Sequence, residues 1–505
     1  MHRSGSFMTL AGAVTALAAM AACSPDAPNP VAPSPSASVA ASSASGRYIL
    51  ASNSGLPADL AAQVAKLGGS VVRVHAGAGI AVVAGISDAK ASQLASIKGV
   101  SDVQPDMVIS LGTPVAAAEA DASAPADAIA SQANPTTASR YAWQWNMRLI
   151  GADKAWAAGK LGSSSVTVAI IDTGIDYDAL DLNGLVDLSR SISFVASDNA
   201  ITSTYFPSRN AISDYNGHGT NVATQVSSKA VALAGVTSKT TLIGVKVLDA
   251  SGHGSLGDVL DGVLWAADNK ADVANMSLGG GFAKAGNGRY VGLINRVFNY
   301  ASRKGTLVVV AAGNDGADLD HDGNTMPTYC SQPQVVCVSA VGPTTWDHIF
   351  PTPTTIAFSA SPSNSDIPAF FTNYGRSSIS VAGPGGNAVV DAAGNIVPSY
   401  WPWGFDIASW VWSFCSKTRI AGFTASGAPV LTACTAGNRI SGFVGTSQAT
   451  PHVAGLAALL VAEKGAGHPA QIKAAIEQSA VDLGQAGTDP YFGKGRISVS
   501  NALGL

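Results

Sequence analysis

From Tyr141 to the C-terminus, short apolar runs alternate with longer segments of helical spacing. Several runs are continuously apolar, which is typical of strands buried on both faces of a sheet. The predicted strands cover residues 165–172, 241–248, 271–278, 306–313 and 335–341, and the predicted helices between them cover 257–269 and 291–305. This alternation predicts an α/β domain over residues 141–505, with a mostly parallel sheet and helices on both faces.

A smaller unit is predicted over residues 47–110. Its strands are expected at 47–52, 71–77, 80–86 and 100–110, and its helices at 56–68 and 87–99. The first helix should bury Leu60, Val64 and Leu67. The second helix should begin after an N-cap at Ser87 and bury Leu94 and Ile97. The order β-α-β-β-α-β predicts a ferredoxin-like α+β domain. It lies between two low-complexity segments, 23–46 and 111–140, which we interpret as linkers.

The N-terminus has the pattern of an export signal. Residues 1–22 combine a weakly basic start with an apolar run that is too short for a comfortable membrane span. Small residues before Cys23 resemble a bacterial lipobox, although Met20 stands where that pattern prefers Leu. Lipid attachment at Cys23 and ordinary signal-peptide cleavage near Ala22 are the two alternatives.

Cysteine spacing is consistent with export to an oxidising compartment. Four of the five cysteines fall into two close pairs, and three connectivities are possible for them. Local pairing would give the disulfides Cys330–Cys337 and Cys415–Cys434. Cys23 would then have no partner, and lipid attachment to Cys23 would explain this odd cysteine.

Composition limits the partners. The chain has 505 residues, of which 47% are hydrophobic and 12% charged, against roughly 25% charged in an average domain. The net charge is −4 and there is no long basic run, so nothing supports nucleic-acid binding.

Four polar residues stand at the edges of predicted elements. Asp172 ends one strand, Asn314 ends another, His218 precedes a helical run, and Ser447 precedes the apolar helix that follows GTSQATPHVAG. Each has a local explanation: a turn former for Asp172 and Asn314, an N-cap for Ser447. His253 stands between glycines as His218 does, so local chemistry does not separate the two.

Their order along the chain is that of the Asp-His-Ser triad of subtilisin. The motifs VAIIDTGID, NGHGTNVA, NMSLGG, VVVAAGND and GTSQATPHVAG together resemble those of subtilisin-like serine proteases, and His218 rather than His253 carries the histidine motif. The resemblance implies a subtilisin-like fold and a serine endopeptidase of polypeptide substrates, with no organic cofactor.

The resemblance also implies individual roles. Asp172, His218 and Ser447 would form the triad, and Asn314 would bind the oxyanion. The segment Ser277, Leu278 and Gly279 would pair with the substrate backbone. Residues 47–110 resemble the inhibitory propeptide of the family, which would act as the enzyme's own inhibitor and folding aid. We expect a monomer that reaches the membrane only through a lipid on the precursor.

Two positions depart from the family pattern. Asn221 stands where the family usually has His, and Gln448 where it usually has Met. Neither belongs to the triad.

Two further segments have open interpretations. Asp318, Asp320 and Asp322 reproduce the D-x-D-x-D-G start of a calcium loop, but Tyr329 stands where the bidentate Glu is expected; the alternative is an acidic solvated loop. Residues 385–440 form a long insertion that contains Trp401, Trp403, Trp410 and Trp412. This insertion is either a surface unit with its own small core or a wall of the substrate cleft.

Other classes of function remain to be weighed. A non-catalytic surface protein on a protease scaffold would need a broken triad, and none of the four residues is missing. An esterase is disfavoured by the triad order and by the substrate-strand motif.

Overall fold

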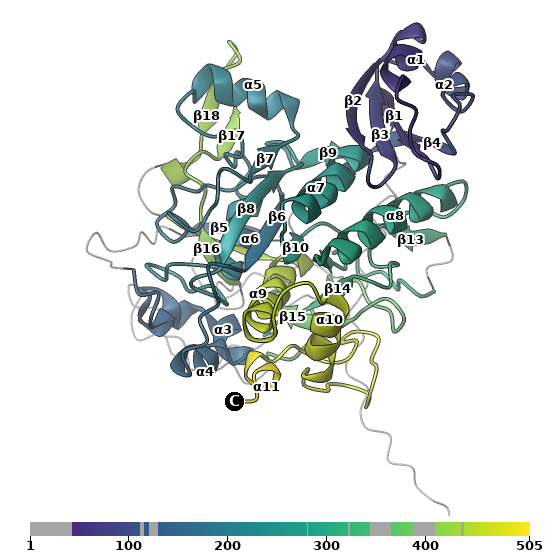
Figure 1. Cartoon of the computed structure of the whole chain (residues 1–505). Coiled ribbons are helices and arrows are strands. Elements are labelled where there is room, and N and C mark those ends of the chain that lie inside the picture. The colour runs from purple at the N-terminus through teal and green to yellow at the C-terminus, as the bar shows by residue number, and fades with distance from the viewer. Residues whose placement is uncertain are drawn as a thin grey trace, which may run out of the picture.

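The computed structural model describes residues 43–111, 116–120, 130–279, 281–321, 324–343, 365–387, 410–435 and 439–505 (Figure 1). The predicted signal sequence, Cys23, Asp322, Trp401 and Trp403 lie outside these ranges. Within the described ranges, no helix is both long and apolar enough to cross a membrane.

The N-terminal domain is a four-stranded antiparallel sheet with two helices. Its elements are β1 (Ser43–Ala51), α1 (Leu60–Lys66), β2 (Ser70–His75), β3 (Ile80–Ala84), α2 (Asp88–Leu94) and β4 (Asp102–Ser110). The strands are ordered β2-β3-β1-β4. This agrees with the predicted element order, although β1 begins earlier than the predicted boundary at Arg47. Ser87 is the N-cap of α2 as predicted, but its side chain makes no capping hydrogen bond.

Among the described residues, the central sheet has seven strands in the order β15-β14-β12-β10-β6-β8-β7, and these strands pair in parallel. The strands are β6 (Thr167–Asp172), β7 (Ile192–Ser193), β8 (Thr241–Lys246), β10 (Val273–Met276), β12 (Leu307–Ala311), β14 (Val336–Val341) and β15 (Val381–Pro384). Strand β6 lies between β8 and β10, so the strands that follow it in the sequence add to the sheet on both sides of it, and the strand order reverses there. In such sheets, ligand sites form at the carboxyl edge near the point where the strand order reverses.

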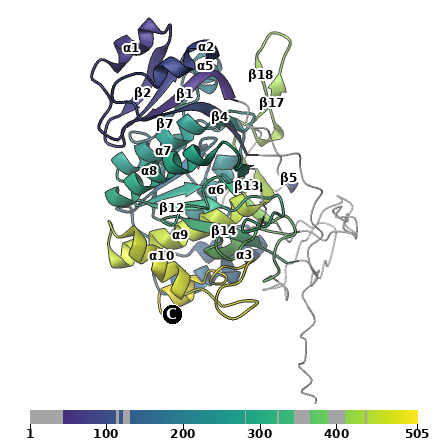
Figure 2. The same ribbon diagram turned by 90° about the vertical axis from the view of Figure 1, so that its right-hand side faces the viewer.

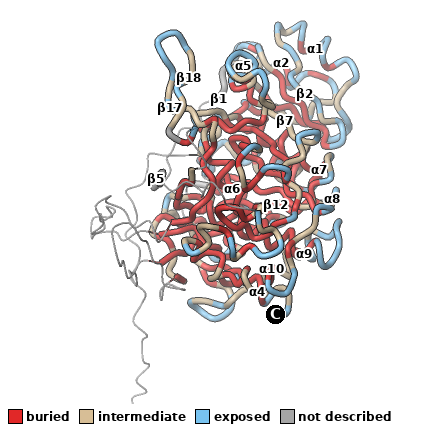
Figure 3. Tube along the Cα trace, turned by 90° about the vertical axis from the view of Figure 1, so that its left-hand side faces the viewer, coloured by how far each residue is buried: buried red, intermediate tan, exposed pale blue. Residues whose placement is uncertain are grey.

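Helices cover both faces of this sheet, as predicted. The main helices are α6 (His218–Val226), α7 (Leu256–Asp268), α8 (Gly288–Lys304), α9 (Thr446–Lys464) and α10 (Pro469–Gln478). In β6, Val168 and Ile170 pack into the core shared with α6 and α9, while Ala169 and Ile171 pack into the core shared with α7 and α8. Burial of alternate residues on opposite faces explains why the interior positions of β6 are all apolar. Figure 3 shows that the chain in the centre of the molecule is mostly buried.

Shorter elements complete the domain. They are the helices α3 (Trp145–Leu149), α4 (Ala152–Ala157), α5 (Ala196–Tyr205) and α11 (Val499–Ala502), the 3-10 turns Pro135–Thr137, Tyr141–Trp143 and Ala433–Thr435, and the paired strands β11 (Gly281–Ala283) and β13 (Thr325–Pro327).

The N-terminal domain packs on α7 and α8 (Figure 1). Its strand β4 continues into the larger domain by pairing with β9 (His253–Ser255), in the register Val108↔Ser255 to Ser110↔His253. Asp106 accepts a hydrogen bond from the backbone N–H of Gly257, in the first turn of α7, at 2.8 Å. The Asp106 carboxylate thus accepts from one N–H of the first turn of α7, while the Ser255 hydroxyl accepts from Asp258 N at 3.1 Å.

The segment predicted to be a linker, 111–140, is partly structured. It contains β5 (Ala116–Ala120), and Ser131 already donates a backbone hydrogen bond to Lys229 of the larger domain. The packed domain therefore begins before Tyr141. A low-complexity composition did not reveal these contacts because they depend on partners far away in the sequence.

The described part of the insertion is built into the main domain. Strand β16 (Val411–Phe414) pairs with β19 (Ile440–Val444), and β5 pairs with the other edge of β19. Trp410 and Trp412 are each 1% exposed and belong to the main core, which does not support the interpretation as a separate surface core. The hairpin β17 (Ile420–Phe423) and β18 (Pro429–Leu431) projects from this unit (Figure 2).

Both locally paired disulfides are present. Cys330–Cys337 links the segment before β14 to that strand, and Cys415–Cys434 closes the base of the projecting hairpin. The Cα atoms are 5.2 and 5.7 Å apart, within the usual range for a disulfide.

Candidate active site

Asp172 and His218 form a buried pair at the carboxyl edge of the sheet. Asp172 is the last residue of β6, and His218 is the first residue of α6. The imidazole Nδ1 lies 2.8 Å from Asp172 Oδ1 and 3.0 Å from Oδ2. Because a carboxylate only accepts, Nδ1 carries the hydrogen and Nε2 is left as the basic nitrogen of a neutral ring.

A second buried carboxylate, Asp214, positions the histidine loop. Its oxygens accept hydrogen bonds from Gly217 N at 2.8 Å and from Thr220 N and Oγ1 at 2.8 and 2.6 Å, at the start of α6. It also accepts from Thr173 Oγ1 at 2.9 Å, and Thr173 in turn accepts from Gly219 N at 2.9 Å. These bonds tie the turn after Asp172 to the helix that carries His218.

Electrostatics favour a more basic imidazole. Burial opposes the charged ring, but attraction to Asp172, the hydrogen bond between the two groups and the charge of Asp214 together raise the pKa of His218 above its ordinary value. This is the arrangement expected of a general base whose protonated form must be stabilised during reaction.

Ser447 lies within the first turn of α9, which begins at Thr446. The N-cap is Gly445, so the interpretation of Ser447 as an N-cap is wrong. The Ser447 hydroxyl donates to the carbonyl of Ser277 at 3.0 Å. Rotation of this hydroxyl toward His218 would be needed before proton transfer, a change that free active sites commonly require.

The same helix contains Pro451, four residues after Ser447. Proline has no N–H, so the carbonyl of Ser447 has no donor from the helix ladder. The Ser277 hydroxyl replaces that donor at 2.8 Å, and Asn275 Nδ2 donates to the same hydroxyl at 3.0 Å. The backbone of Ser447 is therefore fixed by the segment that follows β10.

Asn314 comes shortly after β12, and hydrogen bonds to its side-chain oxygen hold it in place. Its Oδ1 accepts from Thr446 N at 2.8 Å and from Thr446 Oγ1 at 2.9 Å. These contacts orient the amide so that Nδ2 remains as a donor beside the N-terminus of α9. A side-chain N–H next to a helix N-terminus is suited to binding a developing oxyanion.

The predicted substrate segment lies beside Ser447. Ser277, Leu278 and Gly279 continue from β10 without strand pairing of their own, and Ser277 and Leu278 are buried. A Cβ on Gly279 would come within 2.7 Å of the carbonyl oxygen of Ala311, so only glycine allows this close approach to the chain before Asn314.

His218, Asn314 and Ser447 line one cleft of about 190 Å³. The cleft is also lined by Leu111, the residue directly after β4, whose N–H donates to the carbonyl of Gly252 at 3.0 Å. The end of the N-terminal domain therefore reaches into the cleft.

The remaining motif histidines lie elsewhere. His253 belongs to β9 and pairs with Ser110. His452 is fully buried in α9, where Nδ1 is 2.8 Å from the carbonyl of Gln448 and Nε2 is 2.7 Å from Asn146 Nδ2. Burial lowers the pKa of His452 to about 4, so it is a neutral core histidine.

The two departures from the family pattern contact each other. Gln448 Nε2 donates to Asn221 Oδ1 at 3.3 Å, and Gln225 Nε2 donates to the same oxygen at 3.2 Å. Asn221 and Gln448 are both buried, and Gln448 also lines the cleft. One amide pair thus replaces both family residues.

The calcium prediction finds no support in the described part of the loop. Asp318 accepts from the N–H of Asp320 at 3.0 Å and contacts His321 Nδ1 at 3.0 Å, and Asp320 accepts from the N–H and hydroxyl of Ser377 at 3.0 and 2.7 Å. No group of three or more metal-ligating side chains occurs among the described residues. Asp322 lies outside the described residues, and a carboxylate that accepts a hydrogen bond can still bind a cation, so the calcium site at Asp318, Asp320 and Asp322 stays a prediction.

Two residues of the site were missed from the sequence. Asp214 stands four residues before His218, where an acidic residue before a helix start could have been recognised as a cap. Pro451 stands four residues after Ser447 and has no N–H, so the sequence alone could have shown that the carbonyl of Ser447 lacks its helical donor.

The fold and these contacts define a class of protein: a serine hydrolase on a doubly wound parallel sheet, with Asp, His and Ser on three separate elements. The model of the subtilase family matches residues 163–495. The chain belongs to this family.

Individual relatives agree. The chain is 32% identical over 354 residues to the thermophilic serine proteinase of Bacillus sp. (strain AK1). The matched region covers 70% of this chain and 64% of that protein. It is 30% identical over 364 residues to thermitase of Thermoactinomyces vulgaris, covering 71% of this chain and 95% of thermitase. The chain thus spans less than two thirds of the first relative's length.

Solved structures share the fold. The epidermin leader peptide processing serine protease of Staphylococcus aureus aligns with a TM-score of 0.64 at 21% identity, over 92% of this chain and 99% of that one. Fervidolysin from Fervidobacterium pennivorans aligns with a TM-score of 0.61 at 20% identity, over 92% of this chain and 61% of its own.

Proposed function

We propose that the protein is an exported serine endopeptidase that is made as a self-inhibited, self-processing precursor. The observation that carries this proposal is that His218, which lies 2.8 Å from the buried Asp172, lines the same cleft as Ser447 and Asn314. Membership of the subtilase family supports the same chemistry.

In the proposed reaction, Ser447 Oγ attacks the carbonyl carbon of a peptide bond while His218 Nε2 takes its proton. Asp172 holds the ring and stabilises the imidazolium. The oxyanion receives hydrogen bonds from Asn314 Nδ2 and the N–H of Ser447. His218 then returns the proton to the leaving amine, which yields an acyl-enzyme. Water, deprotonated by His218, hydrolyses this ester and restores Ser447.

The N-terminal domain would act as the inhibitor and as a folding aid. Support comes from Leu111 in the cleft, from the β4–β9 pairing and from the cap that Asp106 provides to α7. Leu111 is anchored at Gly252, and Ala116 is opposite Val444. Leu111 lines the cleft that contains Ser447, and Val444 is three residues before Ser447, so we propose that self-processing cuts between Leu111 and Ala116.

The decisive experiment compares the full-length protein with its Ser447→Ala variant. The wild type should hydrolyse casein and convert itself to a shorter form, whereas the variant should do neither and accumulate as a precursor. If the wild type folds and processes itself but Ser447→Ala does so equally well, the proposal fails. A wild type without casein hydrolysis would favour the non-catalytic surface protein.

We further propose export through residues 1–22 with lipid attachment at Cys23. Cleavage after the N-terminal domain would release the enzyme from that anchor. The intact mass of the exported precursor tests this, because a diacylglyceryl-modified Cys23 and an unmodified N-terminus near Ala22 differ by a lipid mass. An unmodified mass would limit the proposal to ordinary secretion.

A further inference from the structure

Arg419 brings a permanent positive charge to the cleft. It is the residue directly before β17 and belongs to the insertion at residues 385–440. Among the described residues that line the cleft with His218 and Ser447, Arg419 is the one with a permanent charge. A Cβ on Gly217 would come within 3.2 Å of Arg419 Cδ and 3.6 Å of Nε, so the arginine side chain lies over the residue next to His218.

Hydrogen bonds fix the backbone on both sides of this arginine to the histidine loop. The hydroxyls of Ser416 and Thr418 donate to the carbonyl of Asp214 at 2.6 and 2.9 Å. On the other side, Ile420 N donates to the carbonyl of Tyr215 at 2.8 Å. The guanidinium is therefore carried by a preorganised segment, which reduces the entropy lost when a ligand binds to it.

The arginine reverses the electrostatics that the rest of the site would impose on a substrate. Asp172 lies 2.8 Å from His218 Nδ1, and Asp214 accepts from Gly217 N at 2.8 Å; both carboxylates are buried. These two charges would repel an acidic side chain placed beside His218. Arg419 offers the opposite sign there. Its five N–H donors allow it to bind a carboxylate through two parallel hydrogen bonds in addition to its contacts within the protein.

We propose that Arg419 is a specificity-determining residue that binds an aspartate or glutamate side chain of the substrate beside the cut bond. This inference rests on the proposed protease function and deepens it, because it names the polypeptides that the cleft prefers. The insertion then forms a charged wall of the substrate cleft. Preferred substrates are extended polypeptides with an acidic residue within two positions of the cut bond.

The protein's own cut segment does not use this contact. Residues 109–118 contain no charged side chain. The N-terminal domain is already held at the cleft by the β4–β9 pairing, so self-processing between Leu111 and Ala116 needs no attraction to Arg419. Self-processing therefore reports whether a variant has folded, independently of any preference for substrate charge.

The test uses internally quenched peptides with the sequence of residues 107–118, cut by the mature enzyme. Positions 110 to 115 are replaced one at a time, in one series by Glu and in the other by its uncharged isostere Gln. At one or two positions, Glu should give a kcat/KM about tenfold higher than Gln, the gain from one charge-assisted hydrogen bond. Mass spectrometry of the products should locate the cut bond within two residues of that glutamate. Raised salt should lower this Glu-to-Gln ratio.

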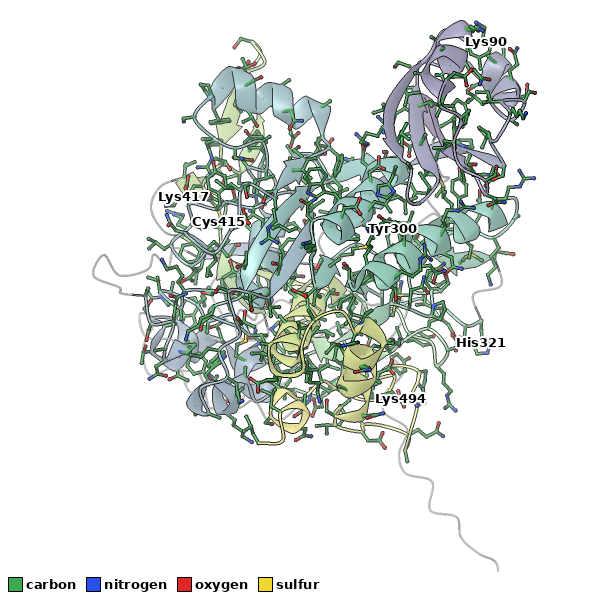
Figure 4. All side chains as sticks on the ribbon, viewed as in Figure 1. Lys90, Tyr300, His321, Cys415, Lys417 and Lys494 are labelled. Carbon is green, nitrogen blue, oxygen red and sulfur yellow. A yellow bond between two sulfur atoms is a disulfide. The ribbon has the colours of Figure 1, made fainter. Side chains whose placement is uncertain are left out.

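Variants of the arginine assign the preference. Arg419→Ala should bring the Glu-to-Gln ratio to about one, Arg419→Glu should bring it below one, and Arg419→Lys should keep part of the preference because it keeps the charge. Lys417→Ala is the matched control, since Lys417 lies in the same loop near Cys415 (Figure 4) and is not one of the residues that line the cleft. Its ratio should equal that of the wild type.

A ratio near one at every position in the wild type would overturn the inference while leaving the protease function intact. The same holds for a ratio that salt does not change, or for one that Arg419→Ala and Lys417→Ala alter equally. The wild-type ratio and its salt dependence decide the matter even where a variant fails to process itself. A wild type that neither processes itself nor hydrolyses casein would instead reject the proposed function.

Discussion

The hydroxyl of Ser277 donates to the carbonyl of Ser447 at 2.8 Å, and the hydroxyl of Ser447 donates to the carbonyl of Ser277 at 3.0 Å. The first bond takes the place of the helix bond that Pro451 cannot make. The nucleophile is thus held by the end of β10 as well as by its own helix.

The first prediction concerns this replacement. Ser277→Ala should leave the carbonyl of Ser447 and the amide of Asn275 without a partner, which costs about 1–3 kcal/mol in the free energy of unfolding. Catalysis should fall through kcat because the backbone that carries Ser447 loosens. Both effects are measured by denaturant unfolding and by steady-state kinetics.

Pro451→Ala provides the control, because it restores the N–H donor within α9. In that background, Ser277→Ala should cost less stability than in the wild type. An identical cost in both backgrounds would show that the two residues are not coupled in this way.

The second prediction concerns pH. The pKa of His218 is raised, so the neutral base is populated only at higher pH than for an ordinary histidine. The acid limb of kcat/KM should therefore have an apparent pKa above 6.5, the ordinary value. Asp172→Asn removes the charge that stabilises the imidazolium, so this limb should move to lower pH while kcat falls about 10⁴-fold.

NMR titration of the His218 ring in the Ser447→Ala precursor gives the same pKa without turnover. Adding Asp172→Asn to that protein should lower the value. An unchanged titration would rule out Asp172 as the source of the shift.

The third prediction concerns oxidation. Gln448 lines the cleft and contains no thioether, so the wild type should retain most activity in mild peroxide, whereas Gln448→Met should lose activity as one sulfoxide forms. Met276, at the end of β10, is 0% exposed and should oxidise slowly. Residual activity and peptide mass spectrometry are the measurements.

A parallel loss in both proteins would contradict this argument and point to Met276. Asn221 matters to the variant because a methionine at position 448 cannot donate a hydrogen bond to Asn221 Oδ1. We expect Gln448→Met to lose stability as well, since Asn221 loses the amide donor at 3.3 Å.

The fourth prediction concerns the contact between the two domains. Arg73 of β2 forms ion pairs with Asp258 and Asp261 on α7, and Arg47 of β1 lies 3.2 Å from Asp258. Removing Arg73 leaves Asp261 without its arginine partner, while Asp258 keeps Arg47. Truncation of one member of such a part-buried cluster typically costs about 2–5 kcal/mol, or about 30-fold or more in affinity. Full-length Arg73→Ala should therefore show activity earlier than the wild type after expression.

Lys90→Ala is the matched control. Lys90 lies at the outer end of the N-terminal domain, far from α7 (Figure 4), where it donates to the carbonyl of Leu67 at 3.1 Å. Its activation time course should follow that of the wild type. If both variants activate alike, the arginine cluster does not hold the domain in place.

The sequence by itself determined the plan of the molecule. Strands that are apolar at every position, such as β12, can be buried only between two helical layers, so the pattern alone predicts a parallel sheet covered on both faces. Short-range spacing also sufficed for Cys330–Cys337 and Cys415–Cys434, because residues close in sequence are close in space. Asp172, His218, Asn314 and Ser447 were recognised because each belongs to a motif of several adjacent residues.

Only the tertiary structure decided which distant groups meet. The contacts of Ser277 with Ser447, of Asp214 with Thr173, and of Asn221 with Gln448 each join segments whose sequences contain no sign of the partner. The same holds for β5, because an alanine-rich strand has no apolar alternation that would specify its register on β19. In the calcium-like loop, the local pattern predicted a cation site, and only the structure showed that Asp320 accepts hydrogen bonds from Ser377 of a distant loop. Local patterns encode burial and turns, whereas hydrogen-bond partners depend on how those elements pack.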